Sequence, residues 1–542
     1  AVTTGVENTL IGGLSGLFAT TADGSTFVGH KAGQGITGAK LTGNNNVAVG
    51  ESAGLLLQGA AAQNTLIGAK AGDAITTAAD NTAVGFQALT STNTGHSNVA
   101  MGTNALNANT GGLRNTGIGF QALANNIGAA DNTGLGHNAG VNLTTGHSSV
   151  AIGSSALLTE DTGRKNVAIG FEALKAQNSD VDNLNTAVGF QAGKAVTTGI
   201  NNVIIGALAG DALTDADNNV AVGQNALGTD TKGSKNTAVG HSALEAQNFT
   251  TSTSSYNTAI GSDAGKAITT GVENTLIGSS AGDAINTGTK NVAVGYGALT
   301  VDTKGSKSTA IGHEALRNQN FTSATDAFNV AVGFSAGNAV TTGAGNTFIG
   351  GLAGDATDDG ANNTAVGYLA LSANCGDQNT ALGRSALQAV TGQQNTAIGY
   401  GAGSGVTTGS NNIIIGRAAD GASGASHQIT IGDNIAGANN DFSFGKASNI
   451  VSNDFDADAN WSRSSDKRLK KNITNQTLGL DFINNLRTVK YNWKPSNELD
   501  STDSQLAHLY KENAADNEMN TSVVMHNFIA QEVKAALDTA GV

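Results

Sequence analysis

The sequence predicts a mainly β protein, in which a long β-solenoid shaft precedes a small α+β domain at the C-terminus. A short phrase, N-T-A-V-G-x-x-A-L with variations, begins 25 times between Asn8 and Gln428, most often with the spacing that separates Asn81 from Asn98. Glycine supplies 74 of the 542 residues and proline only 1. Residues 461–542, in contrast, hold both tryptophans, the proline and just two glycines. Fixed periodicity on this scale is typical of stacked units that contact only their neighbours, and the change of composition predicts a domain boundary near Trp461.

Each repeat has a strand-like half and a turn-like half. With positions counted from the first residue of the phrase, position 5 is Gly in all 25 copies and position 4 is aliphatic throughout. Position 8 is Ala in 23 copies, the exceptions being Ser15 and Ile435. Apolar or β-branched residues before a Gly predict a short strand that ends in a turn, and the other residues, rich in Thr, Gly, Asn and Asp, have the chemistry of turns. Each repeat is therefore expected to form one coil, with equal positions stacked about 4.8 Å apart.

Three segments follow from this pattern. Residues 1–426 are predicted to form the shaft. Residues 427–464 lose the coil pattern but keep strand-like alternation in H-Q-I-T-I-G and D-F-S-F-G, and are expected to form a β neck or tip. Residues 465–542 are expected to form the separate C-terminal domain. Because the chain begins at Ala1 inside a repeat, with neither Met nor a signal peptide, an upstream segment is also expected.

Charge and hydropathy exclude several classes of partner. The net charge is -14, which argues against nucleic acid, because phosphate binding needs a basic surface. No apolar run approaches the roughly 18 residues that a membrane-spanning helix needs, so no membrane insertion is expected. Cys375 is the single cysteine and cannot form an intrachain disulfide.

A single thin coil is poor in core. It offers three or four small apolar side chains, each worth roughly 1–3 kcal/mol if buried, against an ordering cost of about 1.5 kcal/mol per residue. Packing several chains together would hide surface that one chain leaves exposed, so an oligomer is expected, although this reasoning does not fix the number of chains.

The phrase N-x-A-[VI]-G-x-x-A resembles the head repeats of trimeric autotransporter adhesins and the shaft repeats of phage tail fibres. Those heads are homotrimeric left-handed β-rolls. The resemblance, which covers residues 1 to about 435, therefore implies a homotrimeric β-solenoid or β-roll shaft. The repeat is longer than in those heads, which leaves the handedness open.

The C-terminal segment carries a second and more specific pattern. Residues 465–473 read S-D-K-R-L-K-K-N-I, and residues 526–533 read H-N-F-I-A-Q-E-V. Together they resemble the self-cleaving intramolecular chaperone domain of endosialidases and related tail spikes and fibres. The resemblance implies a domain that trimerises, templates the folding of the fibre before it and is then cut off by a serine–lysine dyad.

Individual residues can be matched to that motif. Ser465 matches the nucleophile and Lys470 the lysine that activates it, since a serine hydroxyl needs a neighbouring base; the expected cut is the Ser464–Ser465 bond. The supporting motif residues are Asp466, Arg468, Asn472, Gln531 and Glu532. The chain departs from the family at Asn527, where glycine is usual, and ends at Val542, where relatives continue into further helix, so the domain is truncated or the family varies here. A chaperone that keeps the trimerising fold without cutting is the alternative.

These features favour a bacteriophage tail fibre with structural and host-attachment roles, located in the virion tail. Its expected partners are two further copies of the chain, an upstream virion or cell-surface anchor and a host-cell receptor, either a glycan or an outer-membrane component. A bacterial surface fibre or adhesin of the same construction is the alternative. A polysaccharide-cleaving spike is less favoured because the shaft has few aromatics and no framed acidic pair, and a monomeric ice-binding solenoid is the most remote reading.

No cofactor and no metal is expected. Position 6 is aromatic in eight coils, a ladder that could stack on sugar rings but is better explained by packing between chains or along the shaft. Histidines at this position lack metal-ligand spacing, and aspartates recur in A-G-D-A turns, where solvated turn residues are favoured over calcium ligands. The position-6 aromatics are Phe86, Phe120, Phe171, Phe190, Tyr296, Phe334, Tyr368 and Tyr400; the histidines are His30, His137, His241 and His313; the aspartates are Asp73, Asp211, Asp283 and Asp355.

Overall fold

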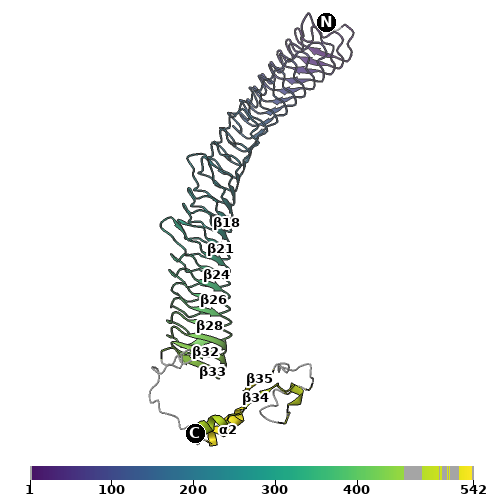
Figure 1. Cartoon of the computed structure of the whole chain (residues 1–542). Helices are drawn as coiled ribbons and strands as arrows, with labels where there is room; N and C mark the ends of the chain where they lie inside the picture. Colours follow the sequence, from purple (N-terminus) through teal and green to yellow (C-terminus); the bar gives the residue numbers. More distant parts are fainter. Residues whose placement is uncertain are drawn as a thin grey trace. The chain divides into compact units, whose positions relative to one another are not determined.

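The computed structural model describes residues 3–456, 479–499, 501–502, 510, 512 and 524–539. The chain divides into two compact units, Ala1–Asp458 and Ala459–Val542. The first unit is a β-solenoid and the second a small unit with two helices and a strand pair (Figure 1). The predicted mainly β fold, with a solenoid shaft before a small α+β segment, is thereby confirmed.

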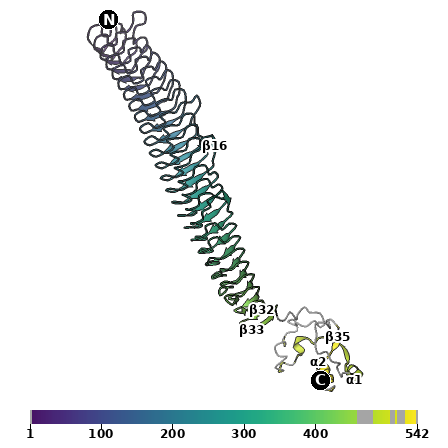
Figure 2. The ribbon, with the colours of Figure 1, turned by 90° about the vertical axis from the view of Figure 1, so that its left-hand side faces the viewer.

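One ladder of short strands runs the length of the solenoid, with the coils stacked one above another (Figure 2). Neighbouring rungs are parallel and in register, so that Ala83 pairs with Ala100, and Ala238 pairs with Ala259 across a longer coil. The three-residue rungs are β1 (Thr9–Ile11), β2 (Thr26–Val28), β3 (Val47–Val49), β4 (Thr65–Ile67), β5 (Thr82–Val84), β6 (Val99–Met101), β7 (Thr116–Ile118), β8 (Thr133–Leu135), β9 (Val150–Ile152), β10 (Val167–Ile169), β11 (Thr186–Val188), β12 (Val203–Ile205), β13 (Val220–Val222), β15 (Thr237–Val239), β17 (Thr258–Ile260), β18 (Thr275–Ile277), β19 (Val292–Val294), β21 (Thr309–Ile311), β23 (Val330–Val332), β24 (Thr347–Ile349), β25 (Thr364–Val366), β26 (Thr380–Leu382), β27 (Thr396–Ile398) and β28 (Ile413–Ile415).

The ladder continues beyond residue 426. β30 (Ile429–Asp433) pairs in parallel with β28, and β32 (Asp441–Lys446) pairs in parallel with β30. The last strand, β33 (Asn449–Asp454), is antiparallel to β32. All 25 copies of the phrase therefore form a rung, and β32 adds one more, in which D-F-S-F-G keeps the glycine at position 5. The predicted boundaries between shaft, neck and C-terminal domain stay predictions.

The glycine at position 5 is required by the spacing of the rungs. Gly119 has a φ of +132°, and a Cβ built on it would lie 2.5 Å from the carbonyl oxygen of Gly136 in the next coil. Real Cβ atoms do not approach backbone this closely, and L-residues rarely adopt such a φ. Only glycine therefore permits the tight turn and the close stacking together.

The core is a column of small side chains that accepts two kinds of coil. Position 3 and position 8 are buried, as at Ala83 and Ala88. Some coils place Leu at position 9 and a polar residue at position 12, as with Leu89 and Thr92. Others place Gly at position 9 and an aliphatic residue at position 12, as with Ile75, whose Cδ1 would lie 2.8 Å from a Cβ built on Gly72. The side chain from position 12 thus occupies the space that Leu fills in the first kind of coil.

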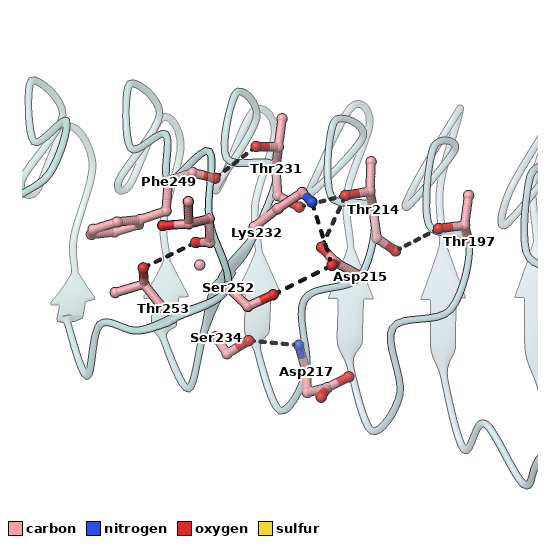
Figure 3. Close-up of polar contacts among 12 residues, drawn as sticks. Thr197, Thr214, Asp215, Asp217, Thr231, Lys232, Ser234, Phe249, Ser252 and Thr253 are labelled. Carbon is pink, nitrogen blue, oxygen red and sulfur yellow. Dashed lines mark hydrogen bonds and ion pairs between the residues drawn. The ribbon is translucent and has the colours of Figure 1, made fainter.

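Polar ladders join the coils inside and outside this core. At position 1, the buried Asn98 accepts a hydrogen bond from the backbone N–H of Asn115 at 2.9 Å, and its Nδ2 donates to the carbonyl oxygen of Gly112 at 2.9 Å. At position 13, Thr197 donates from Oγ1 to the carbonyl oxygen of Thr214 at 3.2 Å, and Thr214 donates to the next coil in the same way (Figure 3). These bonds satisfy backbone N–H and C=O groups that do not take part in the pairing of the short rungs.

Two of the longer coils fold their extra residues into a second, short strand pair. β14 (Gly233–Ser234) pairs with β16 (Thr253–Ser254), and β20 (Gly305–Ser306) pairs with β22 (Thr325–Asp326). Near the end of the shaft, β29 (Asp420–Gly421) pairs with β31 (Ala436–Gly437). Extra residues thus leave the main ladder in register.

The described part of the C-terminal unit contains two helices and one strand pair. These are α1 (Leu480–Asn485), β34 (Thr488–Tyr491), the 3₁₀ turn η3 (Ser496–Glu498), β35 (Met525–Phe528) and α2 (Ala530–Thr539). β34 and β35 are antiparallel. None of the helices in the described part of the chain has the length and apolar character needed to cross a membrane.

Candidate functional site

The outward side of the ladder presents an apolar stripe along the shaft. Within each rung after β1 the middle residue is buried, whereas the residues at positions 2 and 4 face outward; in β1 all three residues are exposed. We call the side chains at positions 2 and 4 the outer ladder face. Its position-4 side chains are aliphatic in every coil, and the larger exposed ones have exposed fractions of 36–59%. They are Ile11, Ile67, Met101, Leu135, Ile205, Ile260, Ile277, Ile311, Ile349, Leu382, Ile398 and Ile431.

The position-6 side chains border one edge of this face. All eight aromatics predicted as a ladder are exposed, with exposed fractions of 44–58%. Several stack on the ring one coil away, as His313 does between Tyr296 and Phe334, with 5.3 Å between ring centroids on each side. The Arg384 guanidinium lies 5.7 Å from the Tyr368 ring and 5.6 Å from the Tyr400 ring. Packing along the shaft therefore occurs, and it leaves much of each ring accessible.

Buried carboxylates hold the loops of three longer coils. Asp230 accepts hydrogen bonds from the backbone N–H groups of Gly233 and Phe249, both at 3.0 Å, and from Nε2 of Gln247 at 2.5 Å. Asp302 makes the equivalent set four coils further along the shaft. Glu160 accepts from the backbone N–H of Gly163 and from Nδ2 of Asn183, and burial raises the pKa of its carboxyl. We call the loops 178–184, 248–256 and 320–328 the three bulges.

Apart from the exposed ring of Tyr256, the surface of the 248–256 bulge is polar. Thr231 donates from Oγ1 to the carbonyl oxygen of Phe249 at 2.7 Å and so continues the threonine ladder into the bulge (Figure 3). Lys232 and Ser252 both approach Oδ2 of Asp215, at 3.6 and 3.4 Å. These contacts are exposed to solvent. They fix the position of the loop but do not enclose a binding site.

One charged cluster on the shaft is fully paired. Glu172 accepts from Lys175 at 2.5 Å, from Gln191 at 2.8 Å and pairs with Lys194 at 2.8 Å. These donors, Lys175 first, lower the pKa of Glu172 to about 2. The cluster ties two neighbouring coils and has the character of a structural ion pair.

The aspartates of the A-G-D-A turns are half-buried, and burial raises the pKa of each. They differ in this from the solvated turn residues expected from the sequence. Throughout the described ranges, His, Cys, Asp and Glu side chains nowhere gather in a group of three that could hold a metal ion.

In the C-terminal unit, an ion pair joins the start of β34 to α2. Arg487 donates from Nη2 to Oε1 of Glu532 at 2.5 Å and from Nε to Oε2 at 3.2 Å. Gln531, the preceding residue of the F-I-A-Q-E-V signature, is exposed. Two-point contact with an arginine fixes the orientation of a carboxylate, so Glu532 helps to set the arrangement of α2 beside β34.

The predicted cleavage residues lie outside the described residues. These are Ser464, Ser465, Asp466, Arg468, Lys470 and Asn472. The Ser465–Lys470 dyad and the cut between Ser464 and Ser465 therefore stay predictions, as do the roles of Gln531 and Glu532.

Three features of the chain were not predicted from the sequence. Arg487 lies outside the motifs identified in the sequence. The buried acids did leave a signal, because D-T-K-G-S-K occurs at 230–235 and again at 302–307, with an acid at position 12 where many coils have an aliphatic residue. The outer ladder face could have been found from the aliphatic residue at position 4 of every coil together with period-2 alternation.

Comparison with known families supports the C-terminal prediction. Residues 465–542 match the family model described as chaperone of endosialidase. No curated protein matches the chain. A long β-solenoid followed by this chaperone domain is the construction of a tail-fibre-like or spike-like protein with a C-terminal intramolecular chaperone.

Proposed function

We propose that the chain forms a homotrimeric tail fibre of a bacteriophage, which attaches the virion to its host cell. The C-terminal domain brings three chains together, starts the folding of the shaft and is then released by autoproteolysis. The observation that carries this proposal is the joining of an endosialidase-type chaperone to a solenoid with one long apolar face.

The outer ladder face supports the assembly of several chains. Large exposed apolar stripes are unusual on monomers and typical of interaction sites. Full burial of an aliphatic side chain corresponds to roughly 60–120 Å² at about 25 cal/mol per Å². The twelve exposed position-4 side chains, at about 40% exposure, therefore offer roughly 300–600 Å² per chain, and the half-buried position-4 side chains of the other rungs add to this area. A stable interface needs about 800 Å² from each partner. The stripe therefore supplies a large part of the area that holding chains together requires.

The C-terminal unit also exposes apolar side chains. Leu480 and Ile483 on α1 and Trp493 after β34 are all exposed. Such a surface on a small unit is in keeping with the self-association that the chaperone family implies.

The proposed cleavage needs only groups of this chain and water. Lys470, as the base, takes the proton of the Ser465 hydroxyl, and the Oγ of Ser465 attacks the carbonyl carbon of Ser464. The peptide C–N bond breaks, the proton passes to the amino group of Ser465, and water then hydrolyses the ester to leave the carboxylate of Ser464. The reaction takes place once per chain.

Electrophoresis of boiled and unboiled protein tests the proposal. We expect an SDS-resistant trimer and a released fragment of about 8 kDa, from 78 residues at roughly 110 Da each. Ser465→Ala and Lys470→Ala should give an uncut trimer, whereas the control Ser462→Ala should be cut normally. A monomer would contradict the trimer, and normal processing of Ser465→Ala would contradict the dyad.

Attachment needs its own measurement. The processed trimer should bind intact host cells and compete with the virus for them, whereas an unprocessed trimer made with Ser465→Ala should compete less well. A fibre found anchored on a bacterial surface instead of in a virion would favour the surface-adhesin alternative.

A further inference from the structure

Three large apolar side chains stand out at one edge of the outer ladder face, at the residue directly before position 1. Leu184, Tyr256 and Phe328 occupy this place as the last residues of the three bulges, and their exposed fractions are 50%, 53% and 57%. The interval from the first to the second equals that from the second to the third, and each interval spans four coils. At about 4.8 Å per rung, neighbouring members are about 19 Å apart along the shaft. We call these three residues the edge pegs.

The backbone at this place makes the edge pegs unusual. The residue before position 1 is left-handed in nearly every coil, and Leu184, Tyr256 and Phe328 have φ values of 55°, 51° and 50°. A bulky apolar residue in this conformation is costly, whereas Asn, Asp and Gly adopt it readily. In the other coils the same place holds a polar residue or glycine, from Glu7 and Gly24 to Asn411 and His427. The sequence thus places a costly side chain there in only three coils, which lie four coils apart.

We infer that the edge pegs set the register between copies of this chain, by meeting the equivalent pegs of two other chains at the same height. This rests on the proposed homotrimer. In a threefold assembly of parallel chains, equal residues lie at equal heights, so all three pegs match when the chains are in register. A slip of one, two or three coils places every peg beside a polar residue or glycine, as at Asn201, Asn218 or Gly345. A slip of four coils matches two pegs but leaves four coils at each end without a partner.

A second copy fits the pegs better than a sugar chain does. Tyr256 and Phe328 each have a lysine over the ring, with Lys235 Nζ at 4.9 Å and Lys307 Nζ at 5.0 Å from the ring centroids, an arrangement that could also serve carbohydrate stacking. Leu184, however, offers no ring, so the property shared by all three is an exposed apolar surface. The pegs also border the outer ladder face, whose exposed aliphatic side chains are proposed to pack against another copy of this chain.

Distances between spin labels in the full trimer test this inference. A single label on Thr94→Cys lies N-terminal to all three pegs, at an exposed site, while Cys375 is buried and should stay unlabelled. The parent should give one narrow distance distribution. The triple variant Leu184→Asn, Tyr256→Asn, Phe328→Asn, in which Asn suits the backbone, should add populations at longer distances, since each slip offsets the labels by multiples of about 4.8 Å in height.

Two further variants separate the causes. The double variant Tyr256→Leu, Phe328→Leu keeps the apolar pegs and should retain the single distance. The control Ile127→Thr, Val301→Ala removes exposed apolar groups away from the outer ladder face and should also retain it. A narrow, unchanged distribution in the triple Asn variant would overturn the inference while leaving the trimer intact; a parent that sediments as a monomer would instead overturn the proposed function.

Discussion

Replacing one glycine of the ladder should open the shaft at a single coil. In Gly119→Ala, the new Cβ would lie 2.5 Å from the carbonyl oxygen and 2.7 Å from the carbonyl carbon of Gly136, on a backbone with a φ of +132°. The strained backbone costs about 1–3 kcal/mol, and forcing an extra carbon into packed structure costs about 1–3 kcal/mol more. We therefore expect a local loss of about 2–6 kcal/mol, confined to the neighbouring coils because solenoid units interact only with their neighbours.

Hydrogen exchange measured residue by residue can detect such a local loss. The backbone N–H of Gly136 donates to the carbonyl oxygen of Ile118 at 2.8 Å, so it reports directly on the β7–β8 rung pair. A loss of about 2 kcal/mol corresponds to about 30-fold faster exchange at this amide, since about 1.36 kcal/mol is a factor of ten. Amides ten coils away should exchange at the rate of the parent.

The same coil offers a matched control. Gly128→Ala adds a Cβ that meets no atom within 4 Å, at a residue outside the left-handed region, and it should leave exchange unchanged or slightly slower, because alanine restricts the unfolded chain. Equal and unchanged protection in Gly119→Ala and Gly128→Ala would refute the reasoning, because the glycine at position 5 would then not be needed for close stacking.

Two further predictions concern the charged groups of the shaft. The pKa of Glu172 is lowered to about 2 in the folded chain, so its contribution to stability is present above the unfolded value near 4.5 and is lost as the pH falls from there toward 2. Glu172→Gln should therefore have a lower melting temperature than the parent at pH 6, and its melting temperature should fall less than that of the parent on acidification. Parallel curves of melting temperature against pH for the two proteins would contradict this. Asp230→Ala leaves the backbone N–H groups of Gly233 and Phe249 without their acceptor, a cost of about 1–3 kcal/mol for each buried group. Limited proteolysis should then cut this bulge, while the bulge held by Asp302 in the same molecule serves as the uncut control; equal resistance of both bulges would show that the carboxylate is not what holds the loop.

The repeated part of the fold could be predicted from the sequence because each coil obeys the same local rules. Glycine at position 5 and an aliphatic residue at position 4 define a strand and its end, and equal spacing implies equal stacking. The rung at β32 was not predicted as a coil because the phrase there is reduced to D-F-S-F-G and follows the preceding copy at a shorter interval than any other.

The buried acids illustrate what local rules miss. In D-T-K-G-S-K, Asp230 is surrounded by residues typical of exposed turns, and only the bulge that folds over it, through Phe249, removes it from water. That contact joins residues 19 apart in a loop without strand or helix periodicity. The pairing of Arg487 with Glu532 is harder still, since 45 residues separate them and neither spacing nor periodicity connects the two.

The position of the last rung helps to explain how the fibre can stay stable after the chaperone domain is released. Within the described residues, the ladder ends with β32 and the antiparallel β33, which stops at Asp454. A cut before Ser465 therefore removes no rung of the ladder, and the shaft keeps all of its stacking interactions. What the cut removes is the domain proposed to align the three chains, so a shaft that opened could not easily be realigned. Its persistence would then depend on slow opening and not on a favourable refolding equilibrium, and the edge pegs would help to keep the register of the processed shaft.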